Sequence, residues 1–235
     1  MTKIIFLHHS TGKVVWRGNT NRVIGKLFKQ GDLKTHIKTH NKSANTNYRI
    51  EEKYYPAPPY GWRNDPFDYY HIWVKNAGEG PHMEQATLEM LTKENDIIIF
   101  KHCYPTSEIL EDTGNPDINS KDKRLENYKL QYEALKQKMY EFPDTKFIVW
   151  TTAVHIEKRL AEDQAKRTLE FHDWIMNEWD EKGDNIYVWD FYSYETEGGL
   201  YLKEEYSDGS SHPNQAFGAR LAPLFAQFII DVAEG

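Results

Sequence analysis

Four short runs of apolar residues constrain the fold of this chain more than any other feature. They are Ile-Ile-Phe-Leu at 4–7, Asp-Ile-Ile-Ile-Phe at 96–100, Phe-Ile-Val-Trp at 147–150 and Ile-Tyr-Val-Trp at 186–189. Runs of this length, rich in β-branched and aromatic residues and without polar alternation, are typical of strands buried on both faces. Segments with helical spacing lie between them. Buried strands that alternate with helices predict an α/β fold whose parallel sheet is covered on both faces.

Weaker patterns predict the remaining elements. Alternation of tyrosine, isoleucine and charge favours a further strand at 48–54, and the polar, aperiodic stretch at 32–46 is expected to be a loop. Helical spacing or helix-start signals predict helices at 19–30, 66–73, 83–93, 125–139, 160–179 and 216–232. A length of 235 residues without internal repeats fits one domain over 1–235, with an aromatic and proline-rich insertion around 54–75.

Charge and cysteine content exclude several classes of protein. Lys and Arg number 29 against 36 Asp and Glu, so the net charge is -7, and a nucleic-acid partner is not expected. The single cysteine, Cys103, rules out an intrachain disulfide and a four-cysteine zinc site. We see no run of about 20 apolar residues, no secretion signal and no cofactor motif. We therefore expect a soluble, cytoplasmic protein with no membrane partner, no metal and no cofactor.

The chemistry of the chain is expected at the carboxyl edge of the sheet, where ligands bind in open α/β folds. Ser10 directly follows the first strand, and Asp208 and His212 stand in a late loop before the last helix. A serine nucleophile needs a base within hydrogen-bond reach, and the base needs an acid to orient it. These three residues therefore predict nucleophilic catalysis with Ser10 as nucleophile, His212 as base and Asp208 as acid.

The same residues resemble the SGNH (GDSL-like) serine hydrolases, in a divergent branch with His-His-Ser in place of Gly-Asp-Ser. The likeness is carried by Phe-Leu-His-His-Ser-Thr-Gly at 6–12, Asn-Ala-Gly-Glu-Gly at 76–80 before the strand at 96–100, and His-Pro-Asn at 212–214. It covers nearly the whole chain. The resemblance implies a three-layer α/β/α sandwich with five parallel strands in flavodoxin-like order. It also implies ester or acyl hydrolysis through an acyl-enzyme.

This chain departs from the family pattern at three places. Residue 9 is His instead of Asp, and Lys-His-Cys-Tyr at 101–104 replaces the block whose Asn donates to the oxyanion. Asp208 also lies four residues before His212 instead of three, so Glu204, Glu205 or a serine–histidine dyad remain alternatives. For the oxyanion and substrate we expect backbone groups of Ser10, together with residues of the 76–80 and 101–103 segments and the aromatic insertion. These expected contact residues are Gly78, Gly80, Lys101, His102, His9 and Trp62.

The predicted substrate is a small-molecule or carbohydrate ester. The carbohydrate part of this prediction depends on the eight aromatic residues between Tyr54 and Trp73, which could form a stacking wall over the crevice or could pack on themselves. Two alternatives to ester hydrolysis are kept. One is a carbohydrate-binding relative that has lost catalysis, and the other is an acyltransferase.

Overall fold

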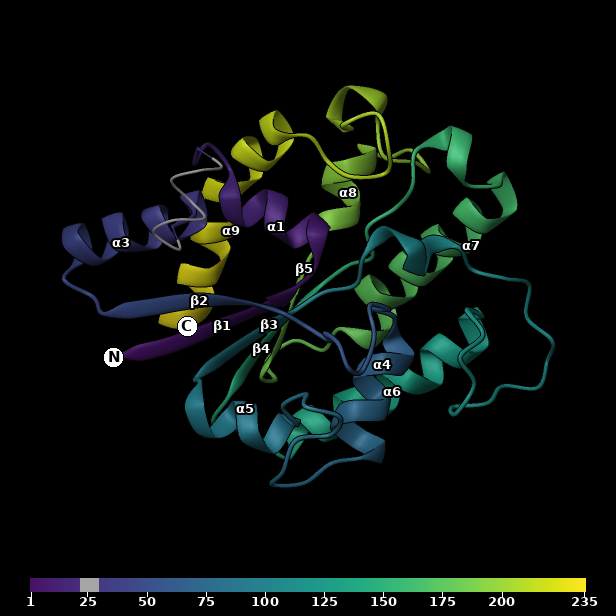
Figure 1. Cartoon of the computed structure of the whole chain (residues 1–235), viewed down its shortest axis with the longest axis horizontal. Coiled ribbons are helices and arrows are strands. Elements are labelled where there is room, and N and C mark those ends of the chain that lie inside the picture. Colours follow the sequence, from purple (N-terminus) through teal and green to yellow (C-terminus); the bar gives the residue numbers. More distant parts are fainter. Residues whose placement is uncertain (22–29) are drawn as a thin grey trace.

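A computed structural model describes residues 1–21 and 30–235 (Figure 1). Five parallel strands form one sheet in the order β2-β1-β3-β4-β5, so the predicted α/β fold with flavodoxin-like order is confirmed. The strands are β1 (Thr2–His8), β2 (Tyr48–Tyr54), β3 (Ile97–Phe100), β4 (Lys146–Trp150) and β5 (Ile186–Trp189). In the register, Ile4 pairs with both Ile50 and Ile97, so β1 lies between its two neighbours.

Helices cover both faces of the sheet and produce the three layers. The described α-helices are α1 (Ser10–Arg17), α3 (Asp32–Ala44), α4 (Pro66–Tyr70), α5 (Leu88–Glu94), α6 (Leu125–Tyr140), α7 (Glu162–Trp174), α8 (Phe191–Thr196) and α9 (Gln215–Glu234). Figure 1 shows α1, α3 and α9 above the sheet, with α4, α5 and α6 below it. Successive residues of a strand point to opposite faces of the sheet, and each face carries its own hydrophobic core. Phe6 and Ile99 pack toward α1 and α9, whereas Leu7 and Phe100 pack toward α5 and α6.

Two local predictions are wrong. The stretch 32–46 is a helix for most of its length, because Leu33 and Ile37 bury one narrow face and Asn45 ends the helix in a left-handed conformation. The helix expected at 83–93 begins only at Leu88, since a tight turn with a bridge between His82 and Gln85 precedes it. The helix expected at 19–30 falls largely on residues 22–29 and so lies outside the described residues.

The final helix, α9, packs closely against α1 near the start of the chain. Gly218 lets α9 approach α1 closely, because a Cβ at this position would lie 2.5 Å from the Val14 carbonyl oxygen. Among the described residues, α9 is also the one helix that is long and apolar enough to cross a membrane, judged by length and composition alone. In the fold, 50% of the most apolar stretch of α9 is buried.

Candidate active site

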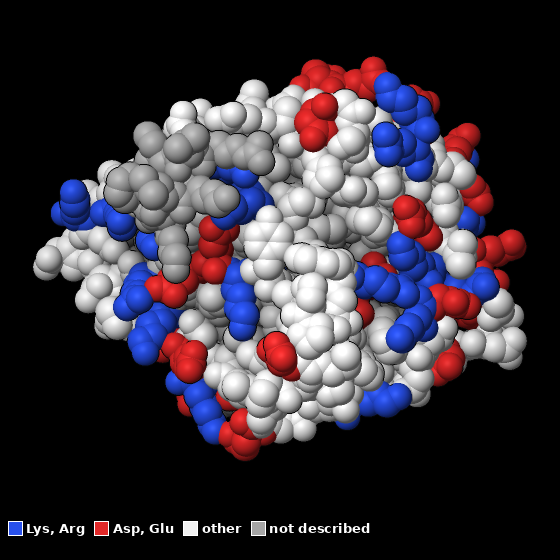
Figure 2. Space-filling view, in the orientation of Figure 1, with Lys and Arg blue, Asp and Glu red and all other residues white. Residues whose placement is uncertain are grey.

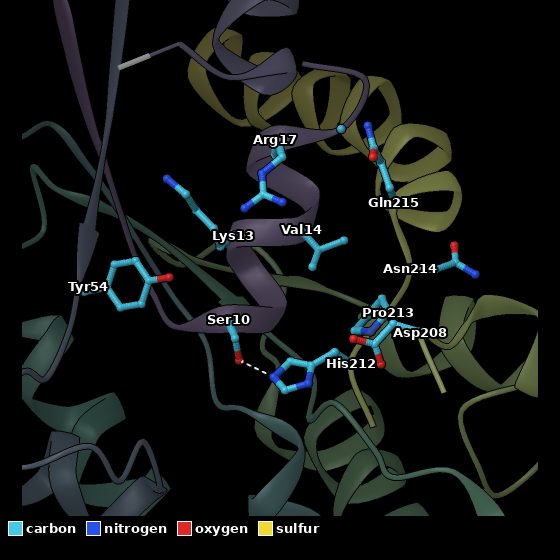
Figure 3. A pocket seen from close by; sticks show the side chains of 11 residues that line it. Ser10, Lys13, Val14, Arg17, Tyr54, Asp208, His212, Pro213, Asn214 and Gln215 are labelled. Carbon is cyan, nitrogen blue, oxygen red and sulfur yellow. Dashed lines mark hydrogen bonds between the residues drawn. The ribbon is translucent and has the colours of Figure 1, made fainter. Parts of the chain in front are cut away.

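Ser10 and His212 meet at the carboxyl edge of the sheet although 202 residues separate them in sequence. Ser10 is the first residue of α1, which begins one residue after β1 ends at His8, and His212 stands in the loop before α9. The Ser10 Oγ lies 2.9 Å from the His212 Nε2 (Figure 3). Both side chains line an open pocket of about 400 Å³. The distance is that of a nucleophile in contact with its base.

The second nitrogen of His212 contacts a serine that the sequence analysis had not singled out. Ser210 Oγ lies 3.0 Å from His212 Nδ1 and donates to Asp208 Oδ1 at 2.6 Å. Because the Ser210 hydroxyl hydrogen is used on the carboxylate, its oxygen is left to accept the Nδ1–H of His212. This assignment leaves Nε2 unprotonated toward Ser10, as a general base requires.

Asp208 therefore acts on His212 through Ser210, and the direct contact that we expected is not present. Asp208 is exposed and belongs to the same pocket, whereas the two alternative acids lie elsewhere. Glu204 is exposed and pairs with Lys158 at 3.1 Å. Glu205 is also exposed, with its carboxylate 3.9 Å from Lys203. Neither lines the pocket that contains Ser10.

The loop from Ser207 to Asn214 is held by its own hydrogen bonds. Asp208 Oδ1 accepts the backbone N–H of Ser210 at 2.9 Å, which is an Asx turn, and the Asp208 N–H donates to the His212 carbonyl at 2.9 Å. Gly209 occupies the turn with a φ of 93°, a conformation that favours glycine. Asn214 caps α9 by accepting the N–H of Phe217 at 2.9 Å. Hydrogen bonds before and after His212 in sequence thus hold its position.

A second histidine supports the first through Tyr104. The Tyr104 ring lies edge-on between two imidazoles, with ring centroids 4.9 Å from His212 and 4.7 Å from His155. His155 contacts Ser211 Oγ at 2.6 Å through Nδ1 and Glu108 at 3.1 Å through Nε2. Since a carboxylate only accepts, Nε2 carries the proton and Nδ1 accepts from the Ser211 hydroxyl. Ser211 is 2% exposed, so this contact anchors the loop beside His212.

The electrostatic setting keeps His212 neutral near pH 7. Burial lowers the pKa of His212 below its ordinary value of 6.5, the charge of Asp208 opposes this change, and the charge of Lys101 adds to it. Burial disfavours the Asp208 carboxylate, but the hydrogen bonds from Ser210 outweigh this effect, and the pKa of Asp208 is lowered. A neutral base beside an ionised acid is the arrangement that general base catalysis needs.

Backbone N–H groups at the start of α1 have no acceptor within the helix, and Ser10 at this end lines the pocket. The first N–H groups of a helix have no acceptor within the helix, and those of Ser10, Thr11 and Gly12 occupy this position. Lys13 is the first residue whose N–H bonds back along the chain, to the His9 carbonyl at 3.0 Å. A Cβ on Gly12 would lie 2.5 Å from the Cβ of His8, so this turn requires glycine for close packing. The first turn of α1 can therefore hold an oxyanion.

None of the six predicted oxyanion and substrate contact residues lines the pocket that contains Ser10, and four of them are fully buried or lie at another edge of the sheet. Gly78 and Gly80 flank Glu79, which lies beside residues 141–145 just before β4, at the opposite edge of the sheet. The segment α4 with its continuation His71–Lys75 has by then carried the chain away from the carboxyl edge. Lys101 and His102 are both 0% exposed, so neither side chain opens into the pocket. The structure therefore does not place these two side chains where an oxyanion at Ser10 would form.

The buried pair after β3 points to opposite faces of the sheet. Lys101 Nζ donates to Cys103 Sγ at 3.2 Å, and burial lowers its pKa. His102 packs against Tyr69 and Tyr132 on the other face, and burial lowers its pKa to about 4. Adjacent residues at a strand end alternate in this way. The sequence showed that this segment departs from the family pattern, but it could not show that both polar side chains are buried.

The aromatic insertion contributes a few exposed rings and a larger buried part. Tyr54 lines the pocket with Ser10, and Trp62, which is 64% exposed, lines a second pocket of about 330 Å³. His9 joins the two walls, stacked on Tyr54 at 5.8 Å and edge-on to Trp62 at 5.7 Å. The other rings are buried or partly buried: Tyr55, Tyr60, Phe67, Tyr69, Tyr70 and Trp73.

His9 supports the wall of the site and does not line either pocket. Its Nε2 donates to the Pro56 carbonyl at 2.6 Å, and the residue is 7% exposed. Burial lowers the pKa of His9 to about 4, so the ring is neutral at physiological pH.

Among the described residues, no group of three or more His, Cys, Asp or Glu side chains could hold a metal ion.

Comparison of the chain with protein-family models, with curated proteins and with solved structures found no match. The functional argument therefore depends on the geometry of the site.

Proposed function

We propose that this chain is a serine hydrolase of SGNH type that cleaves an ester through an acyl-enzyme on Ser10. The observation that carries the proposal is the contact of Ser10 Oγ with His212 Nε2 at 2.9 Å, together with the contact of the opposite ring nitrogen with Ser210. A histidine placed in this way can accept a proton from the serine and is stabilised when it becomes charged.

The proposed reaction proceeds in two halves. The Ser10 hydroxyl proton passes to His212 Nε2 while Oγ attacks the ester carbonyl carbon, and the oxyanion is held by N–H groups in the first turn of α1. The C–O bond to the leaving group then breaks, and His212 returns the proton to the departing alkoxide. Water enters next and gives a proton to the same nitrogen while its oxygen attacks the acyl carbon. The bond from that carbon to Ser10 Oγ then breaks, His212 returns the proton to Oγ, and the acid is released.

The proposed substrate class is a small-molecule ester, including acyl groups on carbohydrate. Exposed Trp62 and Tyr54 support the carbohydrate part, because flat hydroxylated rings stack on such side chains. Basic and acidic side chains are interspersed over the described part of the face shown in Figure 2, which suits a small substrate better than a polyanion.

Labelling with a fluorophosphonate probe tests the proposal. The native protein should be labelled covalently, and Ser10→Ala should abolish both labelling and ester turnover while circular dichroism remains unchanged. Labelling that survives in Ser10→Ala would assign the nucleophile elsewhere. A folded native protein that is not labelled and cleaves no ester would favour the carbohydrate-binding alternative, which oligosaccharide binding would then test.

A further inference from the structure

Helix α1 presents a row of side chains to the pocket in addition to the nucleophile. Ser10, Lys13 and Arg17 lie three and four residues apart, so they share one face of the helix. All three line the pocket, with Tyr54 on the opposite wall (Figure 3). A substrate bound at Ser10 therefore has a path along a helix face that carries two cations.

The two cations differ in whether a carboxylate of the described residues pairs with them. The Lys13 ammonium extends toward β2 and forms an ion pair with Glu52, whose other oxygen contacts the buried His8 at 3.0 Å. Arg17 forms no ion pair with any residue in the described part of the chain. In Figure 3 its guanidinium bends back along the helix toward the Ser10 end of the pocket. The charge of Arg17 is thus left available to a ligand.

The basic side chains that line the neighbouring pocket are paired with carboxylates. There Arg63 pairs with Asp65 at 2.7 Å and Lys123 pairs with Glu108 at 2.8 Å. Of the basic side chains that line these two pockets in the described ranges, Arg17 alone therefore lacks a carboxylate partner. A guanidinium presents a planar fork of donors that matches a carboxylate or phosphate in a bidentate manner.

We propose that Arg17 is a specificity-determining residue that binds an anionic group, foremost a carboxylate, on the substrate of Ser10. Seven residues of helix separate their Cα atoms by about 10 Å along the axis, and the bend of the side chain shortens the gap. The anionic group should therefore lie roughly 5–10 Å from the scissile carbonyl. This inference rests on the proposed function, because it assumes that the ester is cleaved at Ser10.

Two esters of equal chain length test the proposal. In mono-4-nitrophenyl suberate a carboxylate replaces the terminal methyl group of 4-nitrophenyl octanoate. The ratio of kcat/KM for the anionic over the neutral ester should fall about tenfold in Arg17→Gln, a change that corresponds to roughly 1.4 kcal/mol. Arg17→Lys should fall between the two. Arg49→Gln removes the same charge from β2 beside a pocket of Lys3 and Glu94 at the opposite sheet edge, and it should leave the ratio unchanged.

The outcomes separate the two proposals. If both esters are cleaved in a Ser10-dependent manner and the ratio in Arg17→Gln stays within about twofold of the native value, the subsite is refuted and the hydrolase proposal stands. If neither ester is cleaved, the hydrolase proposal fails, and a binding measurement then tests whether Arg17 forms an anion subsite. Monomethyl suberate is then titrated by NMR into Ser10→Ala with and without Arg17→Gln. Weaker binding without Arg17 supports the subsite, and equal or undetectable binding in both overturns it.

Discussion

Replacement of Ser210 by alanine tests whether the acid acts on His212 through a serine hydroxyl. The hydroxyl oxygen accepts from His212 Nδ1 at 3.0 Å, and this nitrogen carries positive charge once Ser10 has given up its proton. A hydrogen bond to a charged group contributes about 1.5–3 kcal/mol. Since about 1.4 kcal/mol corresponds to a tenfold change in rate, Ser210→Ala should lower kcat by roughly 10- to 100-fold.

Asp208→Asn should have a smaller effect than Ser210→Ala. Asparagine keeps an oxygen that can accept from the Ser210 hydroxyl, and the charge of the exposed Asp208 is screened by solvent. The loss in kcat should therefore be only a few-fold. The charge of Asp208 raises the pKa of His212, and the base is active when it is unprotonated. Removal of that charge should therefore move the acid limb of the pH–rate profile to lower pH.

Initial rates on a 4-nitrophenyl ester between pH 4 and 9 give both quantities. Ser210→Thr, which keeps a hydroxyl, should retain most of the activity. Ser207→Ala is the matched control, because this serine bonds Gly209 and the Ser210 carbonyl in the same loop without contacting His212. A native rate in Ser210→Ala, or a loss in Asp208→Asn far larger than in Ser210→Ala, would refute the relay in favour of a direct contact between Asp208 and His212.

Three further predictions concern stability. Ser211→Ala leaves the buried His155 Nδ1 without a partner and should cost about 1–3 kcal/mol in urea unfolding, with wild-type stability as the contrary result. Burial raises the pKa of Glu195 from 4.5 to about 8, so the native state retains this proton where the unfolded state loses it. Stability should fall as pH rises from about 5 to 8, and Glu195→Gln should flatten that slope in pH-dependent unfolding. Gly218→Ala forces a Cβ to within 2.5 Å of the Val14 carbonyl and should destabilise the chain by about 1–3 kcal/mol, measured by thermal unfolding.

The sheet could be predicted from the sequence because burial leaves a strong local signal. A strand covered on both faces admits apolar residues at every position, so 97–100 and 147–150 stand out without any knowledge of the fold. Helix α3 leaves little such signal. Only Leu33 and Ile37 of its 13 residues are buried, and the remaining polar residues hide the helical period.

The site could be predicted where its residues stand beside a strand or a helix end. Ser10 follows β1 and His212 precedes α9, and both elements were visible in the sequence. Gly78 was misplaced because the order of blocks along the chain does not show which edge of the sheet a loop reaches. Here α4 and its continuation cross the layer before that glycine, so the loop emerges at the edge away from Ser10.

The spacing between Asp208 and His212 contained a clue to Ser210 that the sequence analysis did not use. Asp-Gly-Ser is a strong Asx-turn signal, and an Asx turn commits the Asp side chain to the N–H two residues later. In this turn Oδ1 of Asp208 accepts both the N–H and the hydroxyl of Ser210, and the carboxylate does not contact the imidazole ring four residues on. The serine at the end of that turn is then the nearest hydroxyl to both groups, and it contacts each of them. The extra residue in the loop and the interposed serine are therefore one structural feature: the turn that lengthens the loop also places the Ser210 hydroxyl between Asp208 and His212.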